Sequence, residues 1–256
     1  MTGPLGGLVR VGPGPGTILV RMSQTPEEHL SGFVVAVDGP SGSGKSSVSK
    51  QVARTLGFGY LDTGAMYRAL TWWCLHEDVD LTDADAITAA AQRFPLAIGT
   101  DPDAPTVTVG GTDVAAAIRE TRISTNVSAV ATVIPVREIL RVLQRRLISE
   151  ASQAKGGVVA EGRDITTVVA PDAPVRILLT ASEEARLARR STELHGAADA
   201  AAVAATRSQI VDRDKADSAV SEFTVAADGV TTIDTSHLDF EGSVEAVLQV
   251  VGAARA

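Results

Sequence analysis

Residues 39–46 constrain the chain most, because they read Gly-Pro-Ser-Gly-Ser-Gly-Lys-Ser and match the pattern G-x-x-x-x-G-K-S. Glycines in such a loop let the backbone turn tightly and point its N–H groups toward an anion. In this pattern the lysine, here Lys45, reaches the β- and γ-phosphates of a nucleotide, and the hydroxyl of Ser46 binds Mg²⁺. The loop therefore predicts a site for nucleotide phosphates, but it does not identify what receives a phosphate.

The residues on both sides of this loop supply the context that it needs. Phe33–Val37 is a short apolar run, which is typical of a buried parallel strand. After the loop, Val48, Val52 and Leu56 recur every four positions, and Gly57 suits a helix C-cap. A strand, a loop and a helix in this order favour a phosphate loop over a chance turn of glycine and serine.

The rest of the chain alternates between apolar segments of strand length and longer segments with helical spacing or caps. Strands are expected at about 157–160, 175–179 and 230–234. Helices are expected at about 63–75, 82–93, 122–154 with a break at Pro135, 182–195, 197–211 and 240–251. This alternation predicts an α/β fold, with a parallel β-sheet and helices on both of its faces.

The first residues differ in composition from the rest. Residues 1–17 are rich in glycine and proline and have no clear periodicity. We expect residues 1–31 to form a flexible tail ahead of one domain, residues 32–256. One hypothesis from this composition is that translation begins at Met22.

One short segment interrupts the alternation. Phe94–Ile98 and Thr106–Val109 have the character of a hairpin, and an Asp/Pro-rich stretch joins them. The hairpin predicts an inserted subdomain at about 91–124, within a core made of about 32–90 and 125–256.

The composition of the 256-residue chain limits its partners and its compartment. A formal net charge of −8 argues against broad nucleic-acid binding. The single cysteine, Cys74, excludes internal disulfides, and we expect a reducing, cytoplasmic compartment. No apolar run reaches the roughly 18 residues of a membrane span. The four histidines are scattered and do not suggest a metal site. We expect the protein to be a monomer.

Arginines recur at the expected strand ends and helix starts. The planar guanidinium binds phosphate through two parallel hydrogen bonds, and phosphoryl transfer needs cations around the phosphoryl oxygens. The candidates are Arg68, Arg163, Arg186, Arg190 and Arg213. For Arg189 a solvated helix position is favoured. Thr63 and Arg68, at one expected helix start, could hold a second anion, or could belong to an ordinary capped surface helix.

Residues 186–217 have the composition of a lid. Arginines precede a break at Gly196, and an alanine-rich helical segment then returns to Arg213. Such an arm can close over ATP and exclude water, which is the competing acceptor of a phosphoryl group.

Four segments in this order and spacing resemble bacterial cytidylate kinases, and the resemblance covers about residues 33–252. They are Asp38–Ser46, Leu61–Arg68, Glu161–Asp164 with Thr167–Val169, and Arg213–Asp214 with Asp217–Ser218. The expected hairpin is also similar to the enlarged monophosphate-binding domain of that family. The resemblance implies transfer of a phosphoryl group from ATP to CMP or dCMP with Mg²⁺, in pyrimidine nucleotide metabolism.

The resemblance also implies roles for particular residues. It assigns the donor phosphates to Gly39, Pro40, Ser41, Gly42, Ser43, Gly44, Lys45, Ser46 and Ser47, with Ser46 on Mg²⁺. It assigns the acceptor nucleotide to Asp38, Thr63, Arg68, Ser128, Arg137, Arg163, Asp164 and Asp217. The implied catalytic residues are Lys45, Arg163, Arg186, Arg190 and Arg213.

Asp164 and Arg137 are implied to recognise cytosine. The carboxylate can accept a hydrogen bond from the exocyclic amine, and the guanidinium can donate to O2 and N3 of the base. Uracil carries a carbonyl at the same edge and would be repelled by Asp164. The alternative for Asp164 is a simple ion pair with Arg163 or Arg137.

Two positions depart from the family pattern. Val220 stands where the family usually carries an arginine, and the tract from Val220 to Ala226 lacks the usual Pro-Leu. Thr166 stands where glycine is common. Two alternatives stay open: a phosphate-loop kinase for another small acceptor, and an ATP-binding regulatory module. In the second, Thr63, Arg68 and Arg163 would have no role.

Overall fold

The computed structural model describes residues 30–195, 214–215 and 217–256. Residues 1–29 of the expected tail, residue Arg213 and most of the expected lid lie outside the described residues. Among the described residues, no helix is both long enough and apolar enough to cross a membrane.

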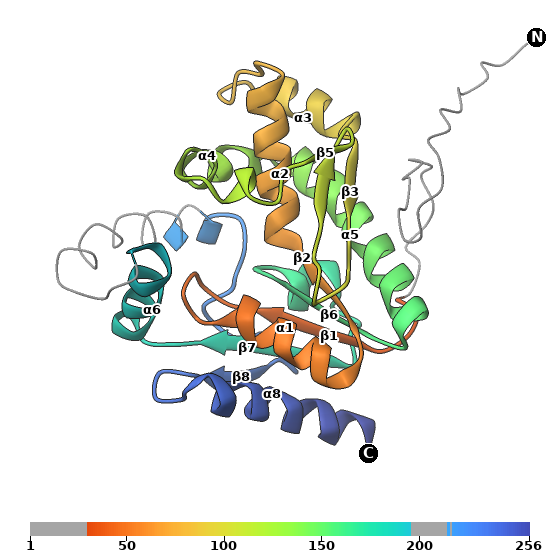
Figure 1. The fold of residues 1–256 in the computed structure, drawn as a ribbon, viewed down its shortest axis with the longest axis vertical. Helices are drawn as coiled ribbons and strands as arrows, with labels where there is room; N and C mark the ends of the chain where they lie inside the picture. Colours follow the sequence, from red (N-terminus) through yellow and green to blue (C-terminus); the bar gives the residue numbers. More distant parts are fainter. Residues whose placement is uncertain (1–29, 196–213, 216) are drawn as a thin grey trace, which may run out of the picture.

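A five-stranded parallel sheet forms the centre of the molecule (Figure 1). Its strands are β1 (Val34–Asp38), β2 (Gly59–Asp62), β6 (Val158–Gly162), β7 (Val175–Thr180) and β8 (Thr231–Asp234). They lie in the order β2-β6-β1-β7-β8, and every neighbouring pair is parallel. The predicted α/β fold class is confirmed.

Helices cover both faces of this sheet, as the apolar run Val34–Val37 of β1 requires. Val34 and Ala36 face the cluster formed with α2 (Thr63–His76) and α5 (Ile134–Lys155). Val35 and Val37 face the opposite cluster, which includes residues of α1 (Lys45–Leu56) and α8 (Phe240–Arg255). Because successive strand residues point to opposite faces, one strand contributes to both cores.

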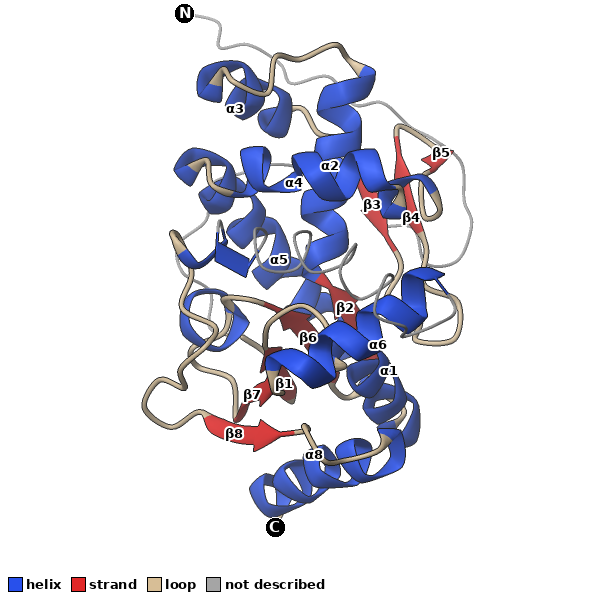
Figure 2. Cartoon of the chain, turned by 90° about the vertical axis from the view of Figure 1, so that its left-hand side faces the viewer, coloured by secondary structure: helices blue, strands red, loops and turns tan. Residues whose placement is uncertain are grey.

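The expected hairpin is present as part of a small antiparallel sheet. Its strands are β3 (Leu96–Ile98), β4 (Val107–Val109) and β5 (Thr112–Asp113). Figure 2 shows this sheet beside α2, well away from β8. β5 has only two residues, both exposed, so no hydrophobic pattern could predict it. Leu96 and Val107 belong to the same apolar cluster as Val34, so the small sheet shares the core of the central sheet.

Further helices are α3 (Ala84–Gln92), α4 (Thr121–Ala131) and α6 (Glu183–His195), with a 3₁₀ turn η1 at Ala117–Arg119. Pro135 lies in the first turn of α5, so the expected break between α4 and α5 is confirmed. Ser182 caps α6, because its Oγ accepts a hydrogen bond of 3.2 Å from the N–H of Ala185.

The carboxyl ends of the parallel strands gather the polar motifs. The phosphate loop follows β1, Asp62 ends β2, and Arg163 and Asp164 follow β6. Since these strands are neighbours in the sheet, residues from three distant segments meet at one edge.

Candidate active site

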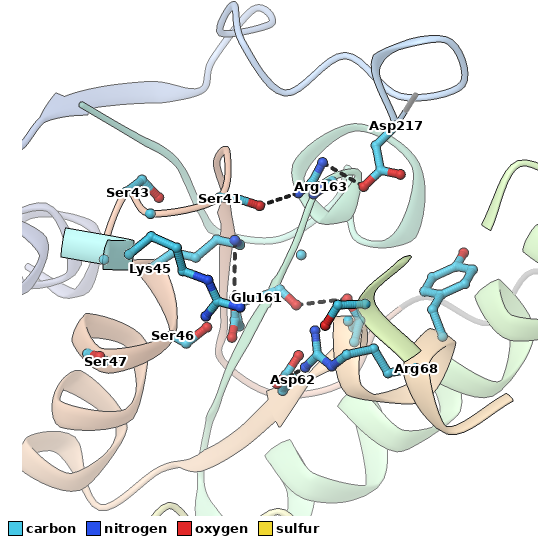
Figure 3. A pocket seen from close by; sticks show the side chains of 18 of the residues that line it. Ser41, Ser43, Lys45, Ser46, Ser47, Asp62, Arg68, Glu161, Arg163 and Asp217 are labelled. Carbon is cyan, nitrogen blue, oxygen red and sulfur yellow. Dashed lines mark hydrogen bonds and ion pairs between the residues drawn. The ribbon is translucent and has the colours of Figure 1, made fainter. Parts of the chain in front are cut away.

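A large cavity lies at this edge, between the phosphate loop on one side and α2 and α4 on the other (Figure 3). Its volume is about 1060 Å³, slightly above the usual range for a site that holds one small molecule. Most of the predicted site residues line it: Ser41, Gly42, Ser43, Gly44, Lys45, Ser46, Ser47, Thr63, Arg68, Ser128, Arg137, Arg163, Asp164, Arg190 and Asp217.

The glycines of the phosphate loop are required by close backbone contacts. A Cβ on Gly39 would lie 2.2 Å from the carbonyl oxygen of Leu179. Gly42 has φ 78°, and a Cβ there would lie 2.6 Å from the carbonyl oxygen of Arg186. The loop then enters α1 at Lys45, so the unpaired N–H groups of a helix N-terminus face the cavity.

Lys45 points from the loop toward a buried carboxylate (Figure 3). Its Nζ lies 4.0 Å from Oε2 of Glu161. Tyr60 donates a 2.9 Å hydrogen bond to the other oxygen of Glu161. Burial raises the pKa of Glu161, and the negative charge of Asp62 raises it further. Glu161 thus lies where the lysine, the loop and the end of β6 meet.

Arg68 is held in place by Asp62. Its Nη2 donates a 2.9 Å hydrogen bond to Oδ2 of Asp62, and Oδ1 accepts one of 2.8 Å from the N–H of Ala65. Burial opposes ionisation of Asp62, but Arg68 and that N–H hold the pKa of Asp62 below its usual value. The Arg68 side chain is 13% exposed, so the alternative of a solvated surface arginine is wrong.

The ion pair weighed as the alternative for Asp164 is present. Nη2 of Arg137 lies 2.5 Å from Oδ2 of Asp164, and it also donates a 2.8 Å hydrogen bond to Oγ of Ser221. Burial raises the pKa of Asp164, and the charge of Arg137 opposes that shift. Ser128 donates a 3.2 Å hydrogen bond to Oδ1 of Asp217. The side chains assigned to cytosine are therefore ordered by protein contacts.

Arg163 joins the phosphate loop to residues 214–217 (Figure 3). Its Nη2 donates a 2.7 Å hydrogen bond to Oγ of Ser41 and lies 3.0 Å from Oδ1 of Asp214. Its Nη1 lies 2.6 Å from Oδ2 of Asp217 as an ion pair, but it is buried and has no aligned hydrogen bond. The cation faces the cavity with part of its donor capacity unused.

Most of the chain is similar in sequence to one protein family. A family model described as cytidylate kinase matches residues 35–253. The chain is 51% identical to the cytidylate kinase of Streptomyces avermitilis, over 87% of this chain and 94% of that protein. It is 47% identical to the one of Streptomyces griseus, over 91% and 99% of the two chains, and 48% identical to the one of Rhodococcus opacus, over 86% and 95%. The chain belongs to the cytidylate kinase family.

Family membership decides between the alternatives that the sequence left open. The prediction of a kinase acting on CMP or dCMP, with ATP as the phosphoryl donor, is confirmed at the level of the family. Neither a regulatory module nor a kinase for another acceptor is needed to explain Arg68 and Arg163, two basic residues outside the phosphate loop.

The assignment of Asp38 to the acceptor nucleotide is corrected, because Asp38 does not line the cavity. Its oxygens accept hydrogen bonds from the N–H of Ile165 at 2.9 Å and of Thr166 at 2.7 Å. The hydroxyl of Thr166 donates a third, of 2.6 Å. Burial raises the pKa of Asp38 to about 6. Asp38 and Thr166 instead fix the π-helical turn η2 (Ile165–Val169), which gives the departure from glycine at residue 166 a structural role.

Three other assignments are also changed. Gly39 and Pro40 belong to the loop but do not line the cavity. Arg186 does not line it either, because its Nη1 donates to the carbonyl oxygen of Ser41 at 3.0 Å and to Oδ2 of Asp214 at 2.6 Å. The resemblance assigns Arg186 as a catalytic cation, but its contacts indicate that it positions the phosphate loop. Arg213 lies outside the described residues.

Arg189 is not the solvated residue that its helical position suggested. It donates hydrogen bonds to the carbonyl oxygen of Ser43, to both oxygens of Thr235 and to the carbonyl oxygen of Leu238. It therefore ties the phosphate loop to the segment after β8. Periodicity misses this contact because the residues that receive most of these bonds lie more than 40 positions away.

Several residues of the cavity were not assigned from the sequence. Asp62 and Glu161 lie inside quoted motifs, and their positions at the carboxyl ends of strands were the available signal. Ser221 had no such signal, since it lies in the segment that departs from the family pattern. The cavity also reaches the start of α8, where it is lined by Leu238, Asp239, Phe240 and Ser243.

Proposed function

We propose that the cavity holds ATP and CMP, or dCMP, at the same time, with the two phosphate groups facing each other. Residues 41–47 bind the donor phosphates through loop N–H groups, the N-terminus of α1 and Lys45. Thr63, Arg68 and Arg163 bind the acceptor phosphate. The volume of about 1060 Å³ supports two ligands, since it exceeds what one small ligand needs.

One observation carries the acceptor site. Among the described residues, Nε of Arg68 is buried and has no hydrogen-bond partner, and Nη1 of Arg163 is buried and is held by its ion pair with Asp217. Both side chains line the cavity. Buried donors are rarely left unpaired, and a phosphate group offers acceptors whose geometry matches the guanidinium. A phosphate between these arginines would accept a hydrogen bond from Nε of Arg68 and would compete with Asp217 for Nη1 of Arg163.

The proposed transfer depends mainly on positioning and charge. Lys45 stabilises the negative charge that develops on the transferred phosphoryl group. Arg163 and Arg190 also line the cavity and contribute further positive charge. Arg213 and Asp217 remain assigned near the sugar and the transferred group. The segment from 186 to 217 remains proposed as the lid that excludes water.

We assign the Mg²⁺ of the reaction to the hydroxyl of Ser46. The side chains of Ser46 and Glu161 are hydrogen-bonded to each other. The Asp62 carboxylate is close enough to Glu161 for its negative charge to act on it. No cluster of three or more His, Cys, Asp or Glu residues in the described part of the chain could hold a metal by itself. A single hydroxyl with nearby carboxylates fits Mg²⁺, which takes most of its ligands from water and substrate phosphates. When bound there, it neutralises phosphate charge.

Cytosine recognition is proposed for Asp164, Arg137 and Ser128. The Arg137–Asp164 pair holds the carboxylate as an acceptor, and the exocyclic amine of cytosine is a donor. A carbonyl at that position would face the carboxylate without a proton between them, which disfavours uracil.

An acceptor panel of CMP, dCMP, UMP and AMP tests the proposal. CMP and dCMP should give the highest kcat/KM, and turnover of UMP or AMP at equal rates would overturn cytosine recognition. Arg68→Ala should raise KM for CMP about 10- to 100-fold, since a hydrogen bond to a charged group contributes about 1.5–3 kcal/mol. Arg122→Ala is the matched control, because that arginine is 59% exposed and pairs only with Glu120 on the surface.

We also propose that the enzyme acts as a monomer in the cytoplasm without nucleic acid. The net charge of −8 and the single buried cysteine support this assignment. Light scattering after size-exclusion chromatography measures the mass of the protein directly. A dimer at micromolar concentration would refute the proposal of a monomer.

A further inference from the structure

Phe223 has an unusual environment for a buried aromatic residue. Its side chain is only 1% exposed, yet it belongs to neither of the two hydrophobic clusters of the molecule. Its ring instead lies under a cation, because the guanidinium carbon of Arg163 is 4.6 Å from the ring centroid. Among the described residues, packing in these two apolar clusters therefore does not account for its burial.

Arg163 is subject to competing attractions at this position. Asp214 and Asp217 approach its nitrogens at 3.0 Å and 2.6 Å, and the hydroxyl of Ser41 accepts at 2.7 Å. The two carboxylates and Phe223 all come from residues 214–223. If these carboxylates alone held the Arg163 guanidinium, the guanidinium would lose its orientation whenever a phosphate displaced the carboxylates.

A ring whose centroid lies 4.6 Å from the guanidinium carbon restricts the cation differently. A guanidinium that stacks on such a ring keeps its plane and leaves the nitrogens at its edge available for hydrogen bonds. Phosphate binding uses that edge. The cation can thus exchange carboxylate oxygens for phosphate oxygens without losing its orientation.

We propose that Phe223 is a positioning residue that sets the plane of the Arg163 guanidinium for the acceptor phosphate. This inference rests on the proposed role of Arg163 in binding that phosphate. Phe223 touches no reacting atom, and it acts only through Arg163. It lies in the segment where the chain departs from the pattern of its family, so the sequence offered no motif for it.

Phe223→Leu is the first test, with kcat and KM measured for CMP and for ATP. A cation–π contact of about 0.5–2 kcal/mol corresponds to a loss of about 2- to 30-fold in kcat/KM for CMP. Phe223→Tyr keeps the ring and should retain the wild-type value. Affinity for ATP alone, measured by titration calorimetry, should not change in either variant. If Phe223→Leu does not fold, Phe223→Met replaces it, because methionine fills irregular space without a ring.

Phe58→Leu is the matched control, since Phe58 is also buried but packs in an apolar cluster. It should lower the melting temperature and leave KM for CMP unchanged. A structural role for Phe223 would make the two leucine variants alike, with lower stability and unaltered KM, and would overturn the inference.

A double-mutant cycle with Arg163→Ala separates the two levels of the proposal. Phe223→Leu should cost nothing further for CMP in the Arg163→Ala background. If it costs as much there as in the wild type, Phe223 does not act through Arg163 and the inference fails. If Arg163→Ala alone leaves KM and kcat for CMP unchanged, the proposed acceptor site itself fails.

Discussion

Asp38→Asn should change how the stability of this protein depends on pH. The carboxyl group is buried beside η2, and burial raises its pKa from 3.8 to about 6. Between these values the folded protein keeps a proton that the unfolded chain releases. This tighter proton binding contributes to the free energy of unfolding. The contribution is complete below pH 3.8 and is lost as the pH rises through about 6. The variant has no such group.

The size of the effect follows from the two pKa values. Their difference is about 2, and each unit corresponds to about 1.4 kcal/mol, so the total is about 3 kcal/mol. We expect the unfolding free energy of the wild type, minus that of Asp38→Asn, to fall by about this amount between pH 4 and pH 7.

Urea denaturation at several pH values measures this difference. Asp103→Asn is the control, since the Asp103 side chain is 76% exposed, and its difference from the wild type should show no such fall. A difference for Asp38→Asn that stays constant or grows with pH would refute the reasoning, and would mean that the three donors from Ile165 and Thr166 outweigh desolvation.

Three further substitutions test the site. Lys45→Ala should lower kcat by about 100- to 1000-fold without changing the melting temperature, because it removes charge stabilisation in the transition state; an unfolded variant in circular dichroism would contradict this. Asp164→Ala should lower kcat/KM for CMP by about 10- to 100-fold through a lost charged hydrogen bond, while calorimetry finds the ATP affinity unchanged; equal losses would instead favour a purely structural ion pair. Arg189→Met removes the hydrogen bonds to Ser43 and Thr235, so KM for ATP should rise and the melting temperature should fall by several degrees. An unaltered KM for ATP would show that the phosphate loop does not need this arginine.

Features that depend on neighbouring residues could be predicted from the sequence. The phosphate loop, the strand before it and the helix after it follow from glycine positions and apolar spacing over residues 33–57. Pro135 marked the start of α5, and Ser182 marked the start of α6. Each of these signals acts within a few residues of its effect.

Features that depend on tertiary contacts could not be predicted in the same way. Asp38 follows an apolar strand next to the loop, a position typical of a ligand-binding residue, but Ile165 and Thr166 occupy its oxygens from 127 and 128 positions away. Arg189 has the spacing of a surface residue, and the approach of Ser43, Thr235 and Leu238 gives it a role in holding the phosphate loop. Pairings of this kind depend on the completed sheet, which local pattern does not encode.

The cations around the cavity are paired with acids of the protein itself. Among the described residues, Arg68 pairs with Asp62, Arg137 with Asp164, and Arg163 with Asp214 and Asp217. An incoming anion at Arg163 must therefore compete with carboxylates that are already in place. Inorganic phosphate offers charge alone and gains little from that exchange, whereas a nucleotide adds contacts through its base and sugar. The internal carboxylates act as built-in competitors that favour the whole substrate over its phosphate.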